Sequence, residues 1–322
     1  LIVKSGTEVI TKPITSFVAT NSTSNSGTVS LTATDTGTID LTLSSSGGYN
    51  IISGSGINNL TGGSGDDTFT IASSGQGNLD VLDGAGGADT LQLSAGSHVF
   101  SSDTNFKNIE TVLANTAGSS VNLSAQTEGF TITGKDGVDT IIGGSGIDII
   151  SGGASGDIIT GGAGNDIITG GAGADTFKVD KDTDTIKDLG GASGGESDIL
   201  IVSKDAKAEA TVSVSFTATS DTVNNAANDV TKAIISTDSD GATINLKDAT
   251  GVYTLKGGDG VDKLTGSAGA DKIESAAGND EITVAAAGHA NTDTMDGGDG
   301  TDVLKLSAGA HTFGDNDKLA NI

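Results

Sequence analysis

The sequence predicts an all-β chain that folds as a parallel β-roll or β-helix solenoid of nonapeptide repeats with interspersed strand-rich segments. Nine-residue units recur along the chain, and each ends in three residues of β-forming type. Fifty glycines are present, and they fall at fixed places in these units, which indicates a repeated backbone turn rather than disorder. Only 3% of the residues are aromatic and none is Trp, so the sequence lacks the large side chains of a thick conventional core.

Five consecutive nonapeptides run from Gly134 to Lys178. Gly predominates at the first, second and fourth places of the unit, and these places form the turn. Asp occupies every sixth place, namely Asp139, Asp148, Asp157, Asp166 and Asp175. An aliphatic or aromatic residue occupies every eighth place, namely Ile141, Ile150, Ile159, Ile168 and Phe177. Two nonapeptides make one coil of turn, strand, turn and strand, so we expect residues 18 apart to stack and the eighth side chain to point inward.

Related units flank this block on both sides. Three precede it, at 53–61, 62–70 and 84–92, and four follow it, at 257–265, 266–274, 275–283 and 297–305. Their sixth-place aspartates are Asp67, Asp89, Asp262, Asp271, Asp280 and Asp302, whereas the unit 53–61 has Asn58 at this place. The alternative for all of these aspartates is a solvated turn residue, because Asp and Gly are common in ordinary turns.

A longer repeat encloses the nonapeptides, since residues 58–109 align without a gap with residues 271–322. We therefore predict five parts: 1–25, a linker or the end of a preceding domain; 26–115, a β module with nonapeptide turns; 116–205, a β-roll with the five consecutive units; 206–227, a strand-rich insert; and 228–322, a truncated β module. Residues 210–219 alternate as a half-buried strand does, and residues 224–234 predict a short helix. Because the first residue is Leu1, we expect a piece of a longer protein.

The stacked aspartates predict bound calcium. Carboxylates stacked in successive coils repel one another unless a cation lies between them, and calcium takes six or more hard oxygens. The chain has no Cys, so oxygen ligands are expected for any metal. We predict several Ca²⁺ ions, with the eleven sixth-place aspartates named above as ligands. The coil buries little apolar area, so calcium binding is expected to supply folding free energy, and the repeats to be largely disordered without it. Asp180, Asp184 and Asp188 either cap the roll or form acidic surface.

Charge and motifs exclude several classes of function. The net charge of −26 disfavours nucleic acid and anionic membranes as partners, and no apolar run is long enough for a membrane span. Neither a Gly-x-Ser-x-Gly elbow with a suitable His nor a His-Glu-x-x-His motif is present. His98 and His311 occupy equivalent places of the long repeat, which indicates packing rather than chemistry. We expect no enzymatic activity.

The pattern G-G-x-G-x-D-x-U-x resembles the calcium-binding repeat of the RTX, or haemolysin-type, family. The match is strongest over Gly134–Lys178, and the segment Val179–Leu189 resembles the part that closes an RTX roll. The resemblance implies export through a type I secretion channel and folding on extracellular calcium. Ser155 at a fourth place and Asn58 at a sixth place depart from the pattern.

Three functional hypotheses follow from this resemblance. The Cys-free, Trp-free composition and the segment Asn105–Val112 resemble bacterial surface-layer proteins. This resemblance predicts a structural protein at the cell surface that assembles with copies of itself into a lattice. It also allows contact with cell-surface polysaccharide or lipopolysaccharide through a region outside this chain. The alternatives are a segment of an RTX adhesin or matrix protein, and the C-terminal carrier region of a type I-secreted enzyme or toxin.

Overall fold

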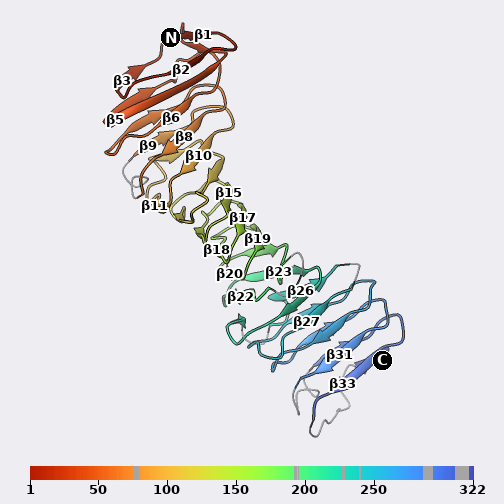
Figure 1. Ribbon diagram of the computed structural model, residues 1–322. Coiled ribbons are helices and arrows are strands. Elements are labelled where there is room, and N and C mark those ends of the chain that lie inside the picture. Colours follow the sequence, from red (N-terminus) through yellow and green to blue (C-terminus); the bar gives the residue numbers. More distant parts are fainter. Residues whose placement is uncertain are drawn as a thin grey trace. The chain divides into compact units, whose positions relative to one another are not determined.

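The computed structural model describes residues 1–74, 80–191, 194, 196–226, 229–238, 241–285, 293–308 and 319–322. The chain divides into two compact units, Leu1–Ser151 and Gly152–Ile322. All regular elements of the described residues are β-strands, and the strands pair in parallel within each unit (Figure 1). Each unit is a β-solenoid, as the sequence predicts.

The first unit stacks its strands in rows. One row consists of β2 (Glu8–Ile10), β5 (Thr28–Asp40), β6 (Asn50–Ile52), β8 (Thr68–Ile71), β10 (Thr90–Leu93), β13 (Thr111–Leu113) and β15 (Thr131–Lys135). A second row consists of β3 (Ile14–Val18), the end of β5, β7 (Asn59–Thr61), β9 (Val81–Asp83) and β12 (Phe106–Lys107). A third consists of β11 (Gly96–Val99), β14 (Ser119–Asn122) and β16 (Thr140–Ile142). Residues 1–25 also hold β1 (Ile2–Val3) and β4 (Ser24–Asn25), which pair with each other.

The second unit has the same construction, and β17 (Ile149–Ala154) contains the division between the units. Its longest row consists of β19 (Ile167–Ala172), β21 (Thr183–Ile186), β23 (Lys207–Val212), β26 (Ala233–Thr237), β28 (Thr254–Lys256), β30 (Lys272–Glu274), β32 (Thr294–Asp296) and β34 (Leu319–Ala320). A second row consists of β18 (Ile158–Thr160), β20 (Thr176–Val179), β22 (Ile199–Val202) and β25 (Val223–Asn224). A third consists of β24 (Ser215–Thr217), β27 (Thr243–Asn245), β29 (Lys263–Thr265), β31 (Glu281–Val284) and β33 (Val303–Leu306).

Coil length follows the nonapeptide count. Where two complete units are adjacent, equivalent positions of successive coils lie 18 residues apart, as for Asp157 and Asp175 or Asp262 and Asp280. This confirms that two nonapeptides form one coil. Elsewhere the coils are longer, with 22 residues between Asp67 and Asp89 and 23 between Asp175 and Asp198. The strands of these longer coils still pair in parallel, with Leu91 opposite Phe69 and Leu200 opposite Phe177.

The core of each unit is narrow. The eighth-place side chains are at most 1% exposed in all five consecutive nonapeptides, so they point inward as predicted. In the first unit the rings of Phe100 and Phe106 lie 4.6 Å apart between centroids, and those of Phe106 and Phe130 lie 5.7 Å apart. Tyr49 and Tyr253, which the sequence places at equivalent positions, are also buried. Together with Phe69, Phe177 and Phe216, these aromatic side chains are the bulkiest parts of a core that is mostly aliphatic.

The long sequence repeat is also a structural repeat. Asn108 and Asn321 occupy equivalent places, and their φ angles of 52° and 51° both fall in the left-handed region, which Asn tolerates. The Asn108 amide donates to Asp83 Oδ1 at 2.7 Å, and the Asn321 amide donates to Asp296 Oδ1 at 2.9 Å. The same sequence therefore forms the same turn in both units.

The prediction of a short helix over residues 224–234 is wrong for the described part of that segment. Strand β25 ends at Asn224, turn residues follow Asp229, and β26 begins at Ala233. Asn224 is buried, its Nδ2 donates to the Val252 carbonyl oxygen at 2.6 Å, and its Oδ1 accepts from the Ala226 N–H. Pairing of β26 with β23 and β28 thus overrides the local preference of an Ala- and Asn-rich segment. The strand expected over 210–219 is present as β23 and β24, with a break at Ser213 and Val214.

Candidate calcium sites

The sixth-place aspartates form ladders along the edges of the solenoid units. Ten of the eleven predicted ligands are at most 2% exposed, and Asp302 is half-buried. At least nine of the eleven carboxylates accept from a backbone N–H of the preceding coil. In the first unit, Asp67 Oδ1 accepts from the Tyr49 N–H at 2.7 Å. In the second, Asp271 Oδ1 accepts from the Tyr253 N–H at 2.8 Å. A charged group thus holds successive turns together from inside.

The 18-residue spacing predicts three stacked pairs in the central block: Asp139 with Asp157, Asp148 with Asp166, and Asp157 with Asp175. Of these, the pair Asp157 and Asp175 lies within a single unit. The Asp157 N–H donates to Asp175 Oδ1 at 2.7 Å, so these two aspartates are stacked. In the other two pairs, Asp139 and Asp148 belong to the first unit and their expected partners, Asp157 and Asp166, to the second. Within the first unit, Asp139 and Asp148 accept from the N–H groups of Ser119 and Phe130 at 2.6 and 2.7 Å.

In several repeats the second carboxylate oxygen closes its own turn. The donor is the backbone N–H of the second residue of the nonapeptide, four residues earlier. Asp67 accepts from Gly63 at 2.6 Å, Asp148 from Gly144 at 2.8 Å, Asp262 from Gly258 at 3.0 Å and Asp271 from Ser267 at 2.6 Å. The carboxylate therefore fixes both the shape of its turn and the distance to the preceding coil.

Other ladder carboxylates keep an oxygen that no donor reaches. The Oδ2 atoms of Asp89, Asp280 and Asp302 are buried and have no hydrogen-bond partner. A buried anionic oxygen without a donor is costly, whereas a bound cation would satisfy it. These atoms fit a calcium ion at the turns.

At the first place of the nonapeptide, a glycine leaves room for a second oxygen beside the carboxylate. A Cβ atom at this position would collide with the carboxylate of the same repeat and with a backbone carbonyl of the following coil. This holds for Gly84 (Asp89 and Asn108), Gly257 (Asp262 and Ser275) and Gly297 (Asp302 and Asn321). The turn thus keeps a small space that is lined by oxygens, and only glycine leaves it open.

The remaining ligands would be mostly backbone carbonyls. Among the described residues, no group of three or more His, Cys, Asp or Glu side chains could hold a metal. Calcium accepts backbone carbonyl oxygens as readily as carboxylates, in contrast to metals that require His or Cys. One or two aspartates with the carbonyls of two stacked turns are therefore a suitable donor set.

Asn58 shows how a turn of this kind is satisfied without a cation. Its Oδ1 accepts from the Gly54 N–H at 2.7 Å. This bond is equivalent to the one that Asp67 accepts from the Gly63 N–H in the next repeat. Its Nδ2 donates to the carbonyl oxygens of Asp35 at 3.0 Å and Gly56 at 2.9 Å. The amide thus occupies two carbonyls that a carboxylate would repel. The polar groups of this turn are thus satisfied without calcium, which agrees with the departure of Asn58 from the calcium-binding pattern.

Burial raises the pKa of the ladder carboxyls. Loss of hydration raises the pKa of Asp67 to about 6, although the N–H groups of Gly63 and Tyr49 oppose the change. The same cause raises the pKa of Asp89, Asp175 and Asp271 to about 7, and neighbouring carboxylates add to it. Without a cation, these groups take up protons as pH falls through about 7 to 6, so calcium binding in this range displaces protons.

The ladders include four further aspartates outside the predicted set: Asp80, Asp184, Asp198 and Asp293. Each is at most 5% exposed and accepts from a backbone N–H of the preceding coil, donated by Asn58, Asp166, Asp175 and Asp271 respectively. Each also stands at the sixth place of a nine-residue window whose glycines are reduced or absent, such as 179–187. Asp80, Asp184 and Asp293 lie nine residues from Asp89, Asp175 and Asp302, so the period could have identified these three without the glycines, whereas Asp198 stands outside the period.

The segment after the central block continues the solenoid, because β21 pairs with β23 and β20 with β22. Asp184 is fully buried, and Asp188 accepts from the N–H groups of Gly170 and Gly171 at 2.9 and 2.8 Å. Asp184 and Asp188 therefore join this coil to the preceding one and neither close the roll nor form only an acidic surface. His98 is buried and its Nε2 lies 2.9 Å from the Ser94 carbonyl oxygen, which agrees with a packing role. His289 and His311 lie outside the described residues.

A comparison with protein families identifies the repeat. The family described as RTX calcium-binding nonapeptide repeat (4 copies) matches residues 46–70, 74–97, 133–166, 151–186, 254–283 and 287–310. The chain is an RTX-repeat protein. All eleven predicted aspartates lie in the matched segments, and the repeats of this family bind calcium, so the chain takes several Ca²⁺ ions. No curated protein matches the chain significantly.

RTX repeats are typical of secreted proteins. Among the described residues, no helix is long and apolar enough to cross a membrane.

Replacing Asn58 by Asp should create a calcium site. N58D removes the amide donor from the Asp35 and Gly56 carbonyls and supplies a carboxylate beside them. Native mass spectrometry should count one more calcium than in the wild type. The matched control is N59D, which adds the same charge at the exposed neighbouring residue and should leave the calcium count unchanged. An unchanged count in N58D would contradict this account of the turn.

Calcium-free and calcium-bound chains should respond oppositely to pH. The folded-state pKa values of about 6 to 7 exceed that of an unfolded Asp, so their favourable contribution is complete at low pH and is lost as pH rises through about 6 to 7. The calcium-free chain should therefore gain folded structure as pH falls from about 8 to about 5. Calcium needs the ionised form, so its apparent affinity should fall as pH falls over the same range. Circular dichroism in chelator and calorimetric calcium titrations at both pH values measure these trends, and parallel trends would contradict the assignment.

Proposed function

We propose that this chain is a building block of a bacterial surface layer, in which calcium-loaded solenoid units assemble with copies of themselves into a lattice. The RTX repeats make the chain a calcium-binding protein of the extracellular structural or adhesin-like kind. Lattice assembly, the cell-surface location and the absence of catalysis belong to the proposal.

The observation that carries the proposal is the repetition of one module in both units. The gapless match of 58–109 with 271–322 extends to the ladder, since Asp67 bonds Asp89 and Asp280 bonds Asp302 with the same 22-residue spacing. Carrier regions of secreted enzymes need one roll to fold outside the cell. A chain that repeats calcium-binding modules with strand-rich inserts is better suited to building an extended structure.

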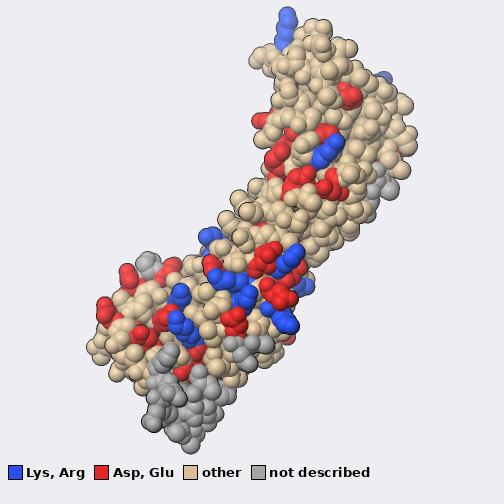
Figure 2. Space-filling model, turned by 180° about the vertical axis from the view of Figure 1, so that it is seen from behind, with Lys and Arg blue, Asp and Glu red and all other residues tan. Residues whose placement is uncertain are grey.

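The surface offers repeated contacts for assembly. Aliphatic side chains at the fifth place of the turn are more than half exposed in Ile57, Val138, Ile147 and Val261. On the face drawn in Figure 2, acidic and basic side chains lie next to one another, and the second unit forms ion pairs such as Lys272–Glu274 and Lys305–Glu281. A net charge of −26 nevertheless makes copies repel, so association should need divalent cations as well as contact.

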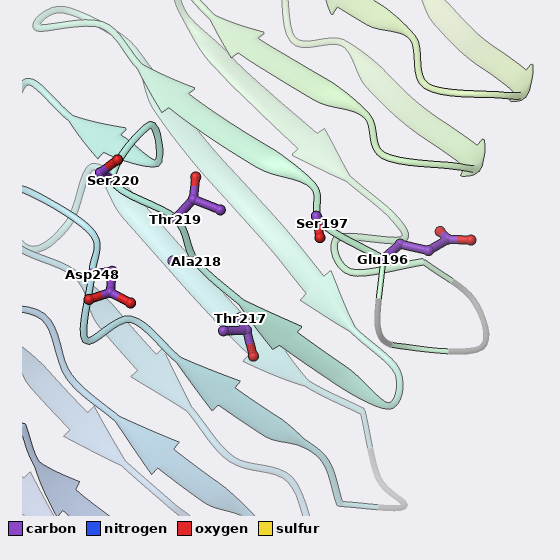
Figure 3. A pocket seen from close by; sticks show the side chains of 7 residues that line it. All are labelled: Glu196, Ser197, Thr217, Ala218, Thr219, Ser220 and Asp248. Carbon is purple, nitrogen blue, oxygen red and sulfur yellow. The ribbon is translucent and has the colours of Figure 1, made fainter.

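One hollow among the described residues gives little support to an enzymatic alternative. It lies in the second unit and is lined by Glu196, Ser197, Thr217, Ala218, Thr219, Ser220 and Asp248 (Figure 3). Its two carboxylates, Glu196 and Asp248, lie at opposite sides of the hollow in this view. The hydroxyl groups between them have no His, Cys or Lys beside them in the lining that would activate a nucleophile.

Electron microscopy tests the proposal directly. The purified chain, with calcium above the level that completes its folding, should form two-dimensional sheets, and the same concentration of magnesium should not. Calcium-folded chains that stay single at every protein concentration would contradict lattice assembly. Single chains that bind cell-surface glycans would favour the adhesin alternative instead.

A further inference from the structure

The longest row of strands in the first unit has an outward face of side chains that carry no charge. Strands β5, β6, β8, β10, β13 and β15 pair in parallel along this row, and several of them are labelled in Figure 1. Alternate side chains such as Phe69, Leu91 and Val112 point inward and are 0% exposed. The outward positions between them, two in each coil, are at least partly exposed: Ser30, Thr32, Asn50, Ile52, Thr68, Thr70, Thr90, Gln92, Thr111, Leu113, Thr131 and Thr133.

These twelve positions, called the threonine face below, are mostly Thr. Thr68, Thr90, Thr111 and Thr131 follow one another in register in four successive coils. The chain has 42 acidic and 16 basic residues, but none of them stands at these positions. The second row of the same unit differs, because Asp83 and Lys107 form an ion pair there.

Strand propensity alone does not explain the lack of charge. Thr favours strands, but the equivalent strands of the second unit carry charged side chains at the same places. By the long repeat, Thr68 corresponds to Glu281 and Gln92 to Lys305. These two charged residues lie on β31 and β33, which pair in the register of β8 and β10, and they form an ion pair. The fold accepts charge at this face, so its absence from the first unit points to a contact.

We propose that the threonine face is a contact surface for a second copy of this chain, with the two faces packed against each other about a two-fold axis. The inference rests on the proposed self-assembly and names the surface that it uses. Two copies with a net charge of −26 each repel, and the repulsion is smallest where neither copy brings a charge. A two-fold pair sets the face against itself, so an uncharged face puts no like charges opposite each other.

The area of the face indicates a weak pair. Paired strands lie about 4.8 Å apart and three residues span about 10 Å, so six coils present a face of about 24 by 10 Å. A stable interface takes about 800 Å² from each partner. The contact is therefore weak alone and suits a lattice, in which each copy makes several contacts at once.

A neutral polysaccharide is the other partner that an uncharged face would admit. The threonine face has no aromatic ring on which a sugar could pack and no carboxylate to accept from its hydroxyl groups. Threonines in register on successive strands instead suit the packing of one sheet on another. A second copy is thus the better partner.

Single cysteines test the contact. The chain has no Cys, so T90C adds one thiol near the middle of the face. With calcium and a mild oxidant, T90C should form a disulfide-linked dimer about tenfold faster than the matched control, because the pair raises the local thiol concentration. The control is V303C, at the equivalent position of the second unit, where Val303 is 51% exposed. Cross-linking traps a weak pair, and equal rates would overturn the proposal as random collision.

A charge on the face gives a second test. T68E places a carboxylate where Glu281 stands in the second unit, so the fold should be kept, as circular dichroism with calcium would check. The two carboxylates of a pair would lie near each other, so cross-linking of T68E/T90C should be about tenfold slower than that of T90C. V303E/T90C, which adds the same charge elsewhere, should cross-link as T90C does. Undiminished cross-linking of T68E/T90C would overturn the proposal.

The outcomes separate this inference from lattice assembly. Calcium-dependent sheets without faster cross-linking of T90C would overturn the contact and leave the lattice. Cross-linked T90C dimers without sheets would support the contact and contradict the lattice. Retention of the calcium-loaded wild type on a neutral dextran resin, lost in T68E and without faster cross-linking of T90C, would assign the face to a sugar polymer and overturn the proposal.

Discussion

The fold depends on one interaction, the bond from a buried aspartate to the backbone N–H of the preceding coil. It occurs in both units and at every coil spacing from 18 to 23 residues, for example in Asp67, Asp175 and Asp198. Because the bond joins equivalent positions of neighbouring turns, it fixes the distance between successive coils at the turns. Strand pairing fixes the distance between successive coils along the sheets. It also places a carboxylate where water does not reach, and that charge must be balanced by a proton or by a cation.

This constraint predicts that calcium binding and folding are coupled. The inward side chains form a narrow aliphatic core, which buries less apolar area per residue than a two-layer domain does. The same core surrounds the ladder with apolar groups, which makes ionised aspartates costly. Calcium reverses that cost, because it replaces a repulsion between coils by an attraction that exists only when the coils are stacked. The ion binds the folded state and has no equivalent site in the unfolded chain.

The sequence predicted the solenoid, the coil of two nonapeptides and the inward eighth place, because a period survives even when individual residues vary. Ile159 opposite Phe177 in strands β18 and β20 shows this register directly. The sequence could not predict that the Asn58 amide satisfies the polar groups of its own turn, since this depends on the carbonyl of Asp35 in the preceding coil. The expected helix over 224–234 failed for a related reason: local composition does not reveal a parallel partner such as β23. Asp80, Asp198 and Asp293 were not predicted, and Asp184 was expected only as a cap or an acidic surface residue, because the segments around them lack the full set of motif glycines.

The central claim is that calcium supplies the free energy that holds the stacked turns together. Far-ultraviolet circular dichroism of the chain near neutral pH, first in chelator and then after addition of calcium, measures this most directly. The account predicts a largely disordered spectrum in chelator and a β spectrum once calcium is present, with magnesium unable to replace it. A β spectrum that is unchanged in chelator would contradict it.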